Sequence, residues 1–213
     1  MFEYELTMID ISLNLVVCNE EQRLSLQLPI LKKLFSEIVI VVQNSDDNTL
    51  QIASKYADVI ITTPRIGFCE ADRILANKAS FKEWILILDA DEMPSDRFIK
   101  EIPTLISQNV DGYYTPRENR LKDKVNVEDK KYRLCRKNCI KYGTLLHSDV
   151  YPVTDNVKQL NYVCIIHNKT YDEFTKDFIL YQKIAKETPQ LMEPCWIDFF
   201  QKQTLSDYEY IYD

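Results

Sequence analysis

The stretch Trp84-Ile-Leu-Ile-Leu-Asp89-Ala-Asp91-Glu92 decides the fold. Its apolar run is bounded by charge on both sides, which is typical of a buried strand and far too short to span a membrane. Three carboxylates follow within residues 89–92. Because ligands in open α/β sheets bind at the carboxyl ends of strands, we expect Asp89 and Asp91 to lie at a ligand-binding edge.

These two aspartates favour a divalent cation between them. Two unit charges about 4 Å apart repel by roughly 4 kcal/mol at an effective dielectric near 20, so a cation stabilises a partly buried acidic pair. Carboxylate oxygens suit Mg²⁺ or Mn²⁺, and Mg²⁺ commonly keeps coordination positions for substrate phosphates. The motif therefore predicts Mn²⁺ or Mg²⁺ and a nucleotide-activated substrate, with a solvated acidic turn as the alternative.

Strand and helix patterns alternate through the first half of the chain, which predicts βαβ units and a mostly parallel central sheet. Right-handed crossovers would cover both faces of that sheet with helices. Ser95 is expected to cap a helix, and Pro29 to kink or split another. The predicted strands span 11–17, 38–42, 59–63 and 84–88, and helices are expected after Glu20, after Asn48, over 70–79 and after Ser95.

Past about residue 110 the pattern predicts an α+β part. Strands are expected at 112–115 and 132–135, and a further apolar run covers 162–166. The charged stretch 118–131 is interpreted as a solvated connection, and Thr170 begins a capping-box helix. We predict one α/β domain over 1–186, with a nucleotide-sugar-binding half at 1–110 and an acceptor-side half at 111–186. Residues 187–213 would form a docked or frayed C-terminal segment.

Composition limits the possible partners. The 213 residues carry a formal net charge of −7, which lacks the basic footprint of most nucleic-acid binders. The first five residues do not resemble a secretory signal, and no apolar run approaches the length of a membrane span. The six cysteines show no zinc or paired spacing, so we interpret them as reduced structural thiols of a cytoplasmic protein.

Taken in order, these motifs resemble the family-2 glycosyltransferases of the GT-A fold, and within them the branch of lipopolysaccharide core β-1,4-glucosyltransferases. The similarity covers most of residues 10–185. It is carried by Val17-Cys-Asn19-Glu20, Ser45-x-Asp47-x-Thr49, Gly67-Phe68 with Arg73, and Asp89-Ala-Asp91-Glu92. The resemblance implies that the nucleotide sugar contacts Asn19, Glu20, Gln43, Asp47, Arg73 and Asp89.

Two positions depart from the family pattern on this donor side. The family places an aspartate directly after the second strand, whereas this chain has Gln43, and it places an asparagine after the arginine, whereas this chain has Ile74. An amide both donates and accepts hydrogen bonds, so base recognition is either kept or shifted by Gln43. A UDP-sugar is the expected donor.

The acceptor side departs as well. The family's Val-His-Glu segment is Leu146-His147-Ser148-Asp149 here, so the usual candidate for a general base is absent. We expect Asp149 to take this role, with Glu92 second and His147 also a candidate. By the same resemblance, His167 joins Asp89 and Asp91 around the metal ion.

The resemblance implies an inverting transfer of a sugar from a nucleotide-diphosphate sugar to a hydroxyl of a glycan or lipid-linked saccharide. One alternative is a glycosyltransferase that modifies hydroxymethylated bases of viral DNA, against which the acidic net charge speaks. Another is a sugar-nucleotide-binding protein without catalysis, suggested by Gln43 and the missing glutamate. A nucleotidyltransferase is disfavoured, because the chain has only three glycines for a phosphate loop. The oligomeric state is left open.

Overall fold

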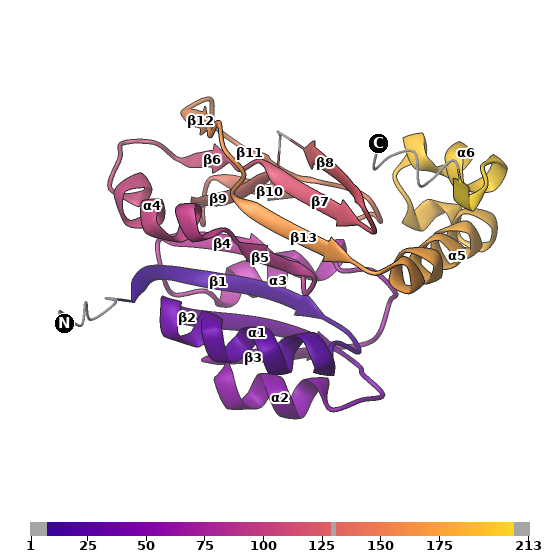
Figure 1. Ribbon diagram of the computed structural model, residues 1–213, viewed down its shortest axis with the longest axis horizontal. Helices are drawn as coiled ribbons and strands as arrows, with labels where there is room; N and C mark the ends of the chain where they lie inside the picture. Colours follow the sequence, from indigo (N-terminus) through magenta and orange to yellow (C-terminus); the bar gives the residue numbers. More distant parts are fainter. Residues whose placement is uncertain (1–7, 129–130, 207–213) are drawn as a thin grey trace.

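The computed structural model describes residues 8–128 and 131–206. A seven-stranded sheet forms its centre, in the order β12-β6-β9-β4-β1-β2-β3 (Figure 1). Four of its strands come from the first half: β1 (Ile9–Val17), β2 (Phe35–Gln43), β3 (Val59–Thr63) and β4 (Trp84–Leu88). They pair in parallel, and the chain order reverses between β1 and β4. The predicted parallel arrangement of this half is confirmed.

The later part of the sheet mixes directions. The strand β9 (Tyr132–Arg136) lies antiparallel between β4 and β6 (Gly112–Tyr114), and β12 (Val157–Gln159) closes the edge in parallel with β6. A short hairpin of β10 (Ile140–Tyr142) and β11 (Val150–Pro152) lies outside this sheet. The structure therefore has the mostly parallel centre and the α+β second part that the sequence predicts.

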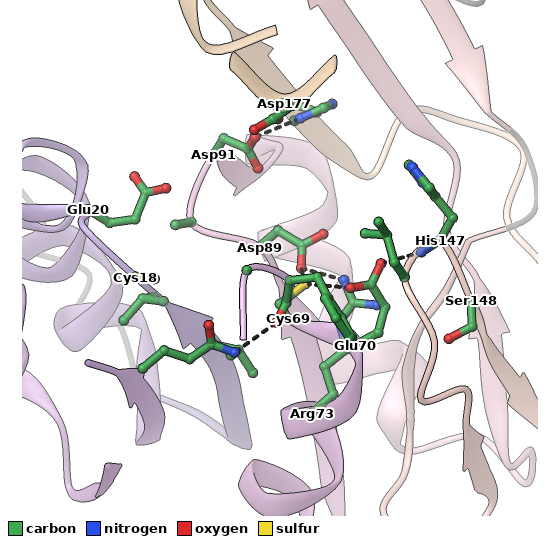
Figure 2. A pocket seen from close by; sticks show the side chains of 18 of the residues that line it. Cys18, Glu20, Cys69, Glu70, Arg73, Asp89, Asp91, His147, Ser148 and Asp177 are labelled. Carbon is green, nitrogen blue, oxygen red and sulfur yellow. Dashed lines mark hydrogen bonds and ion pairs between the residues drawn. The ribbon is translucent and has the colours of Figure 1, made fainter. Parts of the chain in front are cut away.

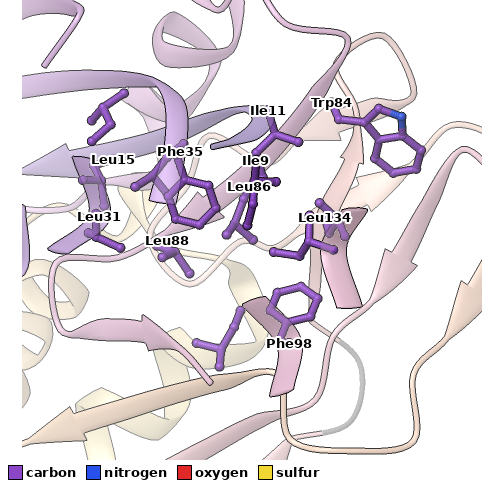
Figure 3. Packing of buried hydrophobic residues seen from close by; sticks show 14 of the residues in the cluster. Ile9, Ile11, Leu15, Leu31, Phe35, Trp84, Leu86, Leu88, Phe98 and Leu134 are labelled. Carbon is purple, nitrogen blue, oxygen red and sulfur yellow. The ribbon is translucent and has the colours of Figure 1, made fainter. Parts of the chain in front are cut away.

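Helices cover both faces of the sheet. On one face, α1 (Glu21–Leu34), α2 (Thr49–Tyr56) and α4 (Asp96–Ile106) pack on the large core, and on the other lies α3 (Arg73–Ala79), which follows the 3-10 turn η1 (Glu70–Asp72). The strand β1 supplies alternate residues to each face, as the period of two requires. Figure 3 shows Leu31, Phe35, Leu86 and Phe98 gathered in the large core.

A second sheet lies beside the end of β4. Its order is β5-β13-β7-β8, built from β5 (Glu92–Pro94), β13 (Ile165–Lys169), β7 (Arg117–Leu121) and β8 (Lys124–Glu128). The interpretation of 118–131 as a solvated connection is wrong, because β7 and β8 form an antiparallel hairpin there. The alternation in Lys124-Val-Asn-Val-Glu128 is the strand signal that this interpretation missed.

The C-terminal helices α5 (Tyr171–Glu187) and α6 (Pro194–Lys202) pack on each other at one end of the molecule, with the turn η2 (Pro189–Leu191) between them (Figure 1). The predicted capping box at Thr170 and cap at Ser95 are confirmed. Pro29 does not split its helix, since α1 runs through it with Leu28 and Leu31 buried. The tail 207–213 and the first residues, 1–7, lie outside the described residues.

All six cysteines are free. Within residues 8–128 and 131–206, no helix combines the length and the apolar character needed to cross a membrane.

Two leucines of α1 allow a matched test of the core. Leu28 is fully buried and Leu26 is 73% exposed. Leu28→Ala should lower the free energy of unfolding by about 2–5 kcal/mol, because it leaves a cavity, whereas Leu26→Ala should change it by less than about 0.5 kcal/mol. Urea unfolding of both variants measures the difference. Equal losses would contradict the described orientation of α1.

Candidate active site

A cavity of about 420 Å³ opens at the carboxyl ends of β1, β2 and β4, where the strand order reverses. This is the place at which open α/β sheets bind their ligands. The segment that follows β3, the loop before β11, the end of β13 and α5 complete its walls. Figure 2 shows Glu20 and Asp91 on one side of this cavity and His147 and Ser148 on the other.

Asp89 is held by two buried arginines. Its Oδ1 accepts from Arg73 on α3 at 2.7 Å, and its Oδ2 accepts from Arg133 on β9 at 3.0 Å. Burial alone would raise the pKa of Asp89, but the two guanidinium groups hold it well below its usual range. Asp89 thus lines the cavity with Arg73 beside it, and both of its carboxylate oxygens are already bound.

Glu92 lies beneath the cavity and outside its lining. Its side chain is fully buried; Oε1 accepts from Arg117 at 2.7 Å, and Oε2 accepts from the backbone N–H of Asp89 at 3.0 Å. A second arginine, Arg133, lies 3.7 Å from the same carboxylate. Because these bonds occupy Glu92 away from the opening, the arrangement gives it a supporting position below the Asp89 motif.

Asp91 and His167 come together across the two sheets. Their Oδ2 and Nε2 atoms are 2.9 Å apart, and Nδ1 of His167 lies 2.8 Å from Oδ1 of Asn119. The register of the second sheet causes this, because His167 on β13 is paired with Glu92 on one side and with Asn119 on the other. Burial alone would raise the pKa of Asp91, but the His167 ring holds it below its usual value.

The spacing of this pair is also compatible with a shared divalent ion. A ring nitrogen that donates to Asn119 leaves Nε2 as an acceptor, so two acceptors face each other until a proton or a cation lies between them. Neighbouring ligands of an octahedral ion, at about 2.1 Å from it, lie about 3 Å apart. The residues present therefore fit a divalent ion held by Asp91 and His167, with positions left for phosphate oxygens.

The expected three-residue ligand set is not preformed. In the part of the chain that the structure describes, no group of three His, Cys, Asp or Glu side chains is placed to hold a metal ion. Asp89, the third expected ligand, is bound by Arg73 and Arg133 instead.

Asn19 and Asp47 build the turns around the cavity and do not line it. Asn19 adopts a positive φ of 56°, and its side chain accepts from the backbone N–H of Asp46 at 2.7 Å. Asp47 accepts from the backbone N–H groups of Glu21 and Thr49 at 3.1 and 2.9 Å, and so caps the first turns of α1 and α2. Both residues join the loop after β1 to the loop after β2.

Gln43, which replaces the family's aspartate, lines the cavity at the end of β2. Its Nε2 donates to the carbonyl of Phe68 at 2.7 Å and to Asp72 at 3.0 Å. Since Nε2 is used in this way, the amide presents Oε1 as its acceptor. The side chain is thus oriented by the protein before any ligand binds.

Glu20 lines the cavity after β1, on the same side as Asp91 (Figure 2). Burial raises the pKa of Glu20 to about 7, with the Asp91 charge adding to this effect and Arg23, at 3.2 Å, opposing it. A carboxyl with such a pKa exchanges a proton near neutral pH.

His147 lies in an aromatic cluster. Its ring stacks on Phe200 at 5.3 Å between centroids and also meets Tyr181 and Trp196, while Nε2 is buried without a hydrogen-bond partner in the described structure. Burial lowers the pKa of this imidazole to about 4. Its backbone N–H donates to Glu70 at 2.9 Å, so the residue links α6 to the cavity wall.

Asp149 lines the cavity in the loop before β11. Its side chain is 46% exposed, and Oδ1 is 3.4 Å from Nζ of Lys131. Several cavity residues were missed in the sequence, among them Glu70, Lys131, Lys169 and Tyr181. They come from four segments that are remote in sequence, so no local motif marks them.

The middle of the chain, residues 12–167, matches the model of glycosyl transferase family 2. The chain belongs to this family. An uncharacterized glycosyltransferase of Rickettsia typhi is 30% identical over 104 residues, which cover 48% of the chain and 35% of that protein. A second one, from Rickettsia conorii, is 29% identical over 104 residues, 48% of the chain and 36% of that protein. The matched region thus spans about a third of the length of these relatives.

Solved structures confirm the GT-A fold. The structure of S. aureus TarS residues 1–349 in complex with UDP-GlcNAc matches 90% of the chain and 70% of that fragment, with a TM-score of 0.58 and 15% identity. The complex of the same fragment with UDP gives a TM-score of 0.59 at 17% identity, over 90% of the chain and 69% of the fragment. The resemblance to lipopolysaccharide core enzymes stays a prediction.

The buried arginine on β9 can be tested against its neighbour on the same strand. Arg133→Met should lower the free energy of unfolding by about 3 kcal/mol or more, because it leaves the buried charges of Asp89 and Glu92 without this partner. Arg136→Met should cost less, about 1 kcal/mol, since its carboxylate partners Glu83 and Asp111 are 72% and 25% exposed and its Nε donates one hydrogen bond, of 3.1 Å, to the Val110 carbonyl. Denaturant unfolding at neutral pH measures both. A loss no larger for Arg133→Met would contradict the described network.

His147 predicts a pH dependence of stability. The unfolded chain takes up a proton near pH 6.5, whereas the folded chain resists protonation down to about pH 4, so stability falls as the pH falls between these values. This effect should reach about 1–2 kcal/mol between pH 7 and pH 5. His147→Phe keeps an aromatic ring in the cluster and should remove that part of the loss. An unchanged difference between the two pH values would refute the assignment.

Proposed function

We propose that this chain is a glycosyltransferase that moves a sugar from a nucleotide-diphosphate sugar, with UDP as the nucleotide, to a hydroxyl of a saccharide acceptor. The observation that carries the proposal is the Asp91–His167 pair at the edge of a cavity located at the switch point of a family-2 domain. The solved TarS complexes with UDP and UDP-GlcNAc support the choice of donor.

Gln43 supports a pyrimidine at the donor end. Its Nε2 is bound to Phe68 and Asp72, and its Oε1 then remains to accept the N3–H of a uracil ring. An aspartate would offer the same acceptor, so the departure from the family pattern keeps the group that this contact requires. Glu20 and Arg73 line the same side of the cavity and would contact the sugar nucleotide. Asn19 and Asp47 would act by shaping the two loops around it.

Asp91 and His167 would hold Mn²⁺ or Mg²⁺. When bound, such an ion neutralises charge that develops on the departing diphosphate. Asp89 would serve the donor without joining the ion directly, because Arg73 and Arg133 occupy its oxygens. The charges of these arginines are balanced by Asp89 and Glu92, so their role is to hold Asp89 in place below the diphosphate site.

On the acceptor side, Asp149 would act as the general base. The acceptor oxygen forms a bond to the anomeric carbon from the face opposite the diphosphate, the bond from that carbon to the phosphate oxygen breaks, and the hydroxyl proton passes to Asp149. The half-exposed carboxylate of Asp149 suits this task better than His147, whose ring is enclosed by aromatic side chains. Glu92 is buried under two arginines and would support the site from below.

Asp91→Asn tests the proposal. It should lower sugar transfer at least about 100-fold, because a bound metal contributes several kcal/mol to transition-state stabilisation. UDP release from UDP-glucose and UDP-GlcNAc, with Mn²⁺ or Mg²⁺ and alkyl glycosides as acceptors, measures this effect. Chelation of the metal should lower transfer by the wild-type chain to the same extent. Added Mn²⁺ should then restore the wild-type activity.

The control is Asp198→Asn on α6. The Asp198 side chain is 77% exposed, so this variant should keep wild-type activity. If the wild-type chain binds UDP and turns over none of these donors, the chain is a binding protein and the proposed activity is wrong. Full activity of Asp91→Asn would remove the metal site from the proposal.

A further inference from the structure

A series of ion pairs of alternating charge runs along and beneath the cavity floor, from Arg73 to Asp149. Consecutive members are joined by ion pairs of 2.5 to 3.7 Å. Because each acid except the terminal Asp149 lies between two bases, removal of one member leaves a neighbour with only part of its counter-charge. In order, the members are Arg73, Asp89, Arg133, Glu92, Arg117, Glu128, Lys131 and Asp149.

The Asp149 carboxylate, at the end of this series of ion pairs, needs a contact that holds it in place. The Asp149 side chain is 46% exposed and belongs to the loop between β10 and β11. A half-exposed carboxylate on a loop populates several rotamers, and confining it to one costs entropy. A general base must nevertheless lie within about 3.2 Å of the proton that it removes.

Lys131 is placed to supply that contact. Its side chain is only 18% exposed, and Nζ lies between two carboxylates, 3.4 Å from Asp149 and 3.6 Å from Glu128. Glu128 is bound at 2.5 Å by Arg117, its direct cross-strand partner in the β7–β8 hairpin. Arg117 in turn binds the fully buried Glu92 below the Asp89 motif. The ammonium group is therefore connected through Glu128 and Arg117 to the fully buried Glu92.

We propose that Lys131 is a positioning residue that holds the Asp149 carboxylate towards the acceptor hydroxyl, and that Glu128 and Arg117 fix Lys131 relative to the donor. This inference rests on the proposed function, in which Asp149 is the base. The β7–β8 hairpin then has a definite task, which is to set the distance between the donor site and the base.

The distances suit this role. Strong charge-assisted hydrogen bonds measure about 2.7–2.9 Å, and the two contacts of Lys131 are longer than that. Lys131 thus attracts the Asp149 carboxylate without a short bond to it, and the carboxylate keeps lone pairs for the acceptor hydroxyl. Burial alone would raise the pKa of Glu128, but Arg117 and Lys131 lower it, so Glu128 stays charged as the second support of the lysine.

The test compares Lys131→Met, Lys131→Arg and the control Lys141→Met, which removes an exposed lysine on β10 outside the cavity. Lys131→Met should lower kcat about tenfold or more, since an unheld base loses part of the 10²–10⁴-fold that such groups contribute. The Kd for UDP, measured by calorimetry, should change by less than about twofold, because the donor contacts are kept. Lys131→Arg should restore most of the rate, and Lys141→Met should leave it unchanged. Activity is measured as UDP release from UDP-glucose or UDP-GlcNAc with alkyl glycosides or water as acceptor.

A double variant separates positioning from general structural damage. If Lys131 acts through Asp149, then adding Lys131→Met to Asp149→Asn should lower kcat no further than Asp149→Asn does alone. Additive losses of kcat in the double variant would overturn the inference. A wild-type kcat for Lys131→Met would also overturn it, as would a loss of UDP affinity as large as the loss of kcat.

The failure of this inference differs from that of the proposed function. If wild-type chain releases UDP from a donor and Lys131→Met does so equally fast, only the role of Lys131 is wrong. If the wild-type chain binds UDP but releases none from either donor, both the activity and the role of Lys131 are wrong.

Discussion

The carboxylate of Asp89, bound by Arg73 on one side and by Arg133 on the other, is the interaction on which the site depends. The arginines come from α3 and β9, which lie in different halves of the chain. A buried charge that loses its partner costs about 3–5 kcal/mol. The two halves of the chain are therefore strongly favoured to pack in the arrangement that pairs Asp89 with both Arg73 and Arg133. The end of β4 is thereby fixed at the floor of the cavity, and the remaining acids are placed relative to it.

Each acid of the site has a different environment, so the carboxyl groups differ in charge partners, exposure and pKa. Asp89 is saturated by arginines and Asp91 faces an imidazole, whereas Asp149 remains half-exposed beside one lysine. Glu20 is buried enough to hold a proton near neutral pH. Sequence neighbours such as Asp89 and Asp91 thus differ in chemistry, because their partners come from elements that are far apart along the chain.

The β7–β8 hairpin shows how a local pattern acquires a role through its register. Arg117 lies opposite Glu128 on the neighbouring strand, and Asn119 lies opposite His167 on β13. A shift of one residue would turn both groups to the other face of the sheet. The second sheet therefore connects His167, beside Asp91, to Arg117 and Glu128 through one set of strand pairings.

The sequence by itself determined the parallel strands, the helices on both faces, the caps at Ser95 and Thr170, and the place of the Asp89-Ala-Asp91 motif, because each follows from local periodicity or spacing. Only the tertiary structure decided which acids are free for a ligand. It bound Glu92 and both oxygens of Asp89 to arginines, enclosed His147 among aromatic rings, and placed Asn19 and Asp47 outside the cavity. It also brought Arg117 opposite Glu128 in the β7–β8 hairpin; the alternation of β8 is visible in the sequence, but its partner strand is not. The contacts that decide these outcomes join residues up to 77 positions apart, and no local pattern specifies which of those residues meet.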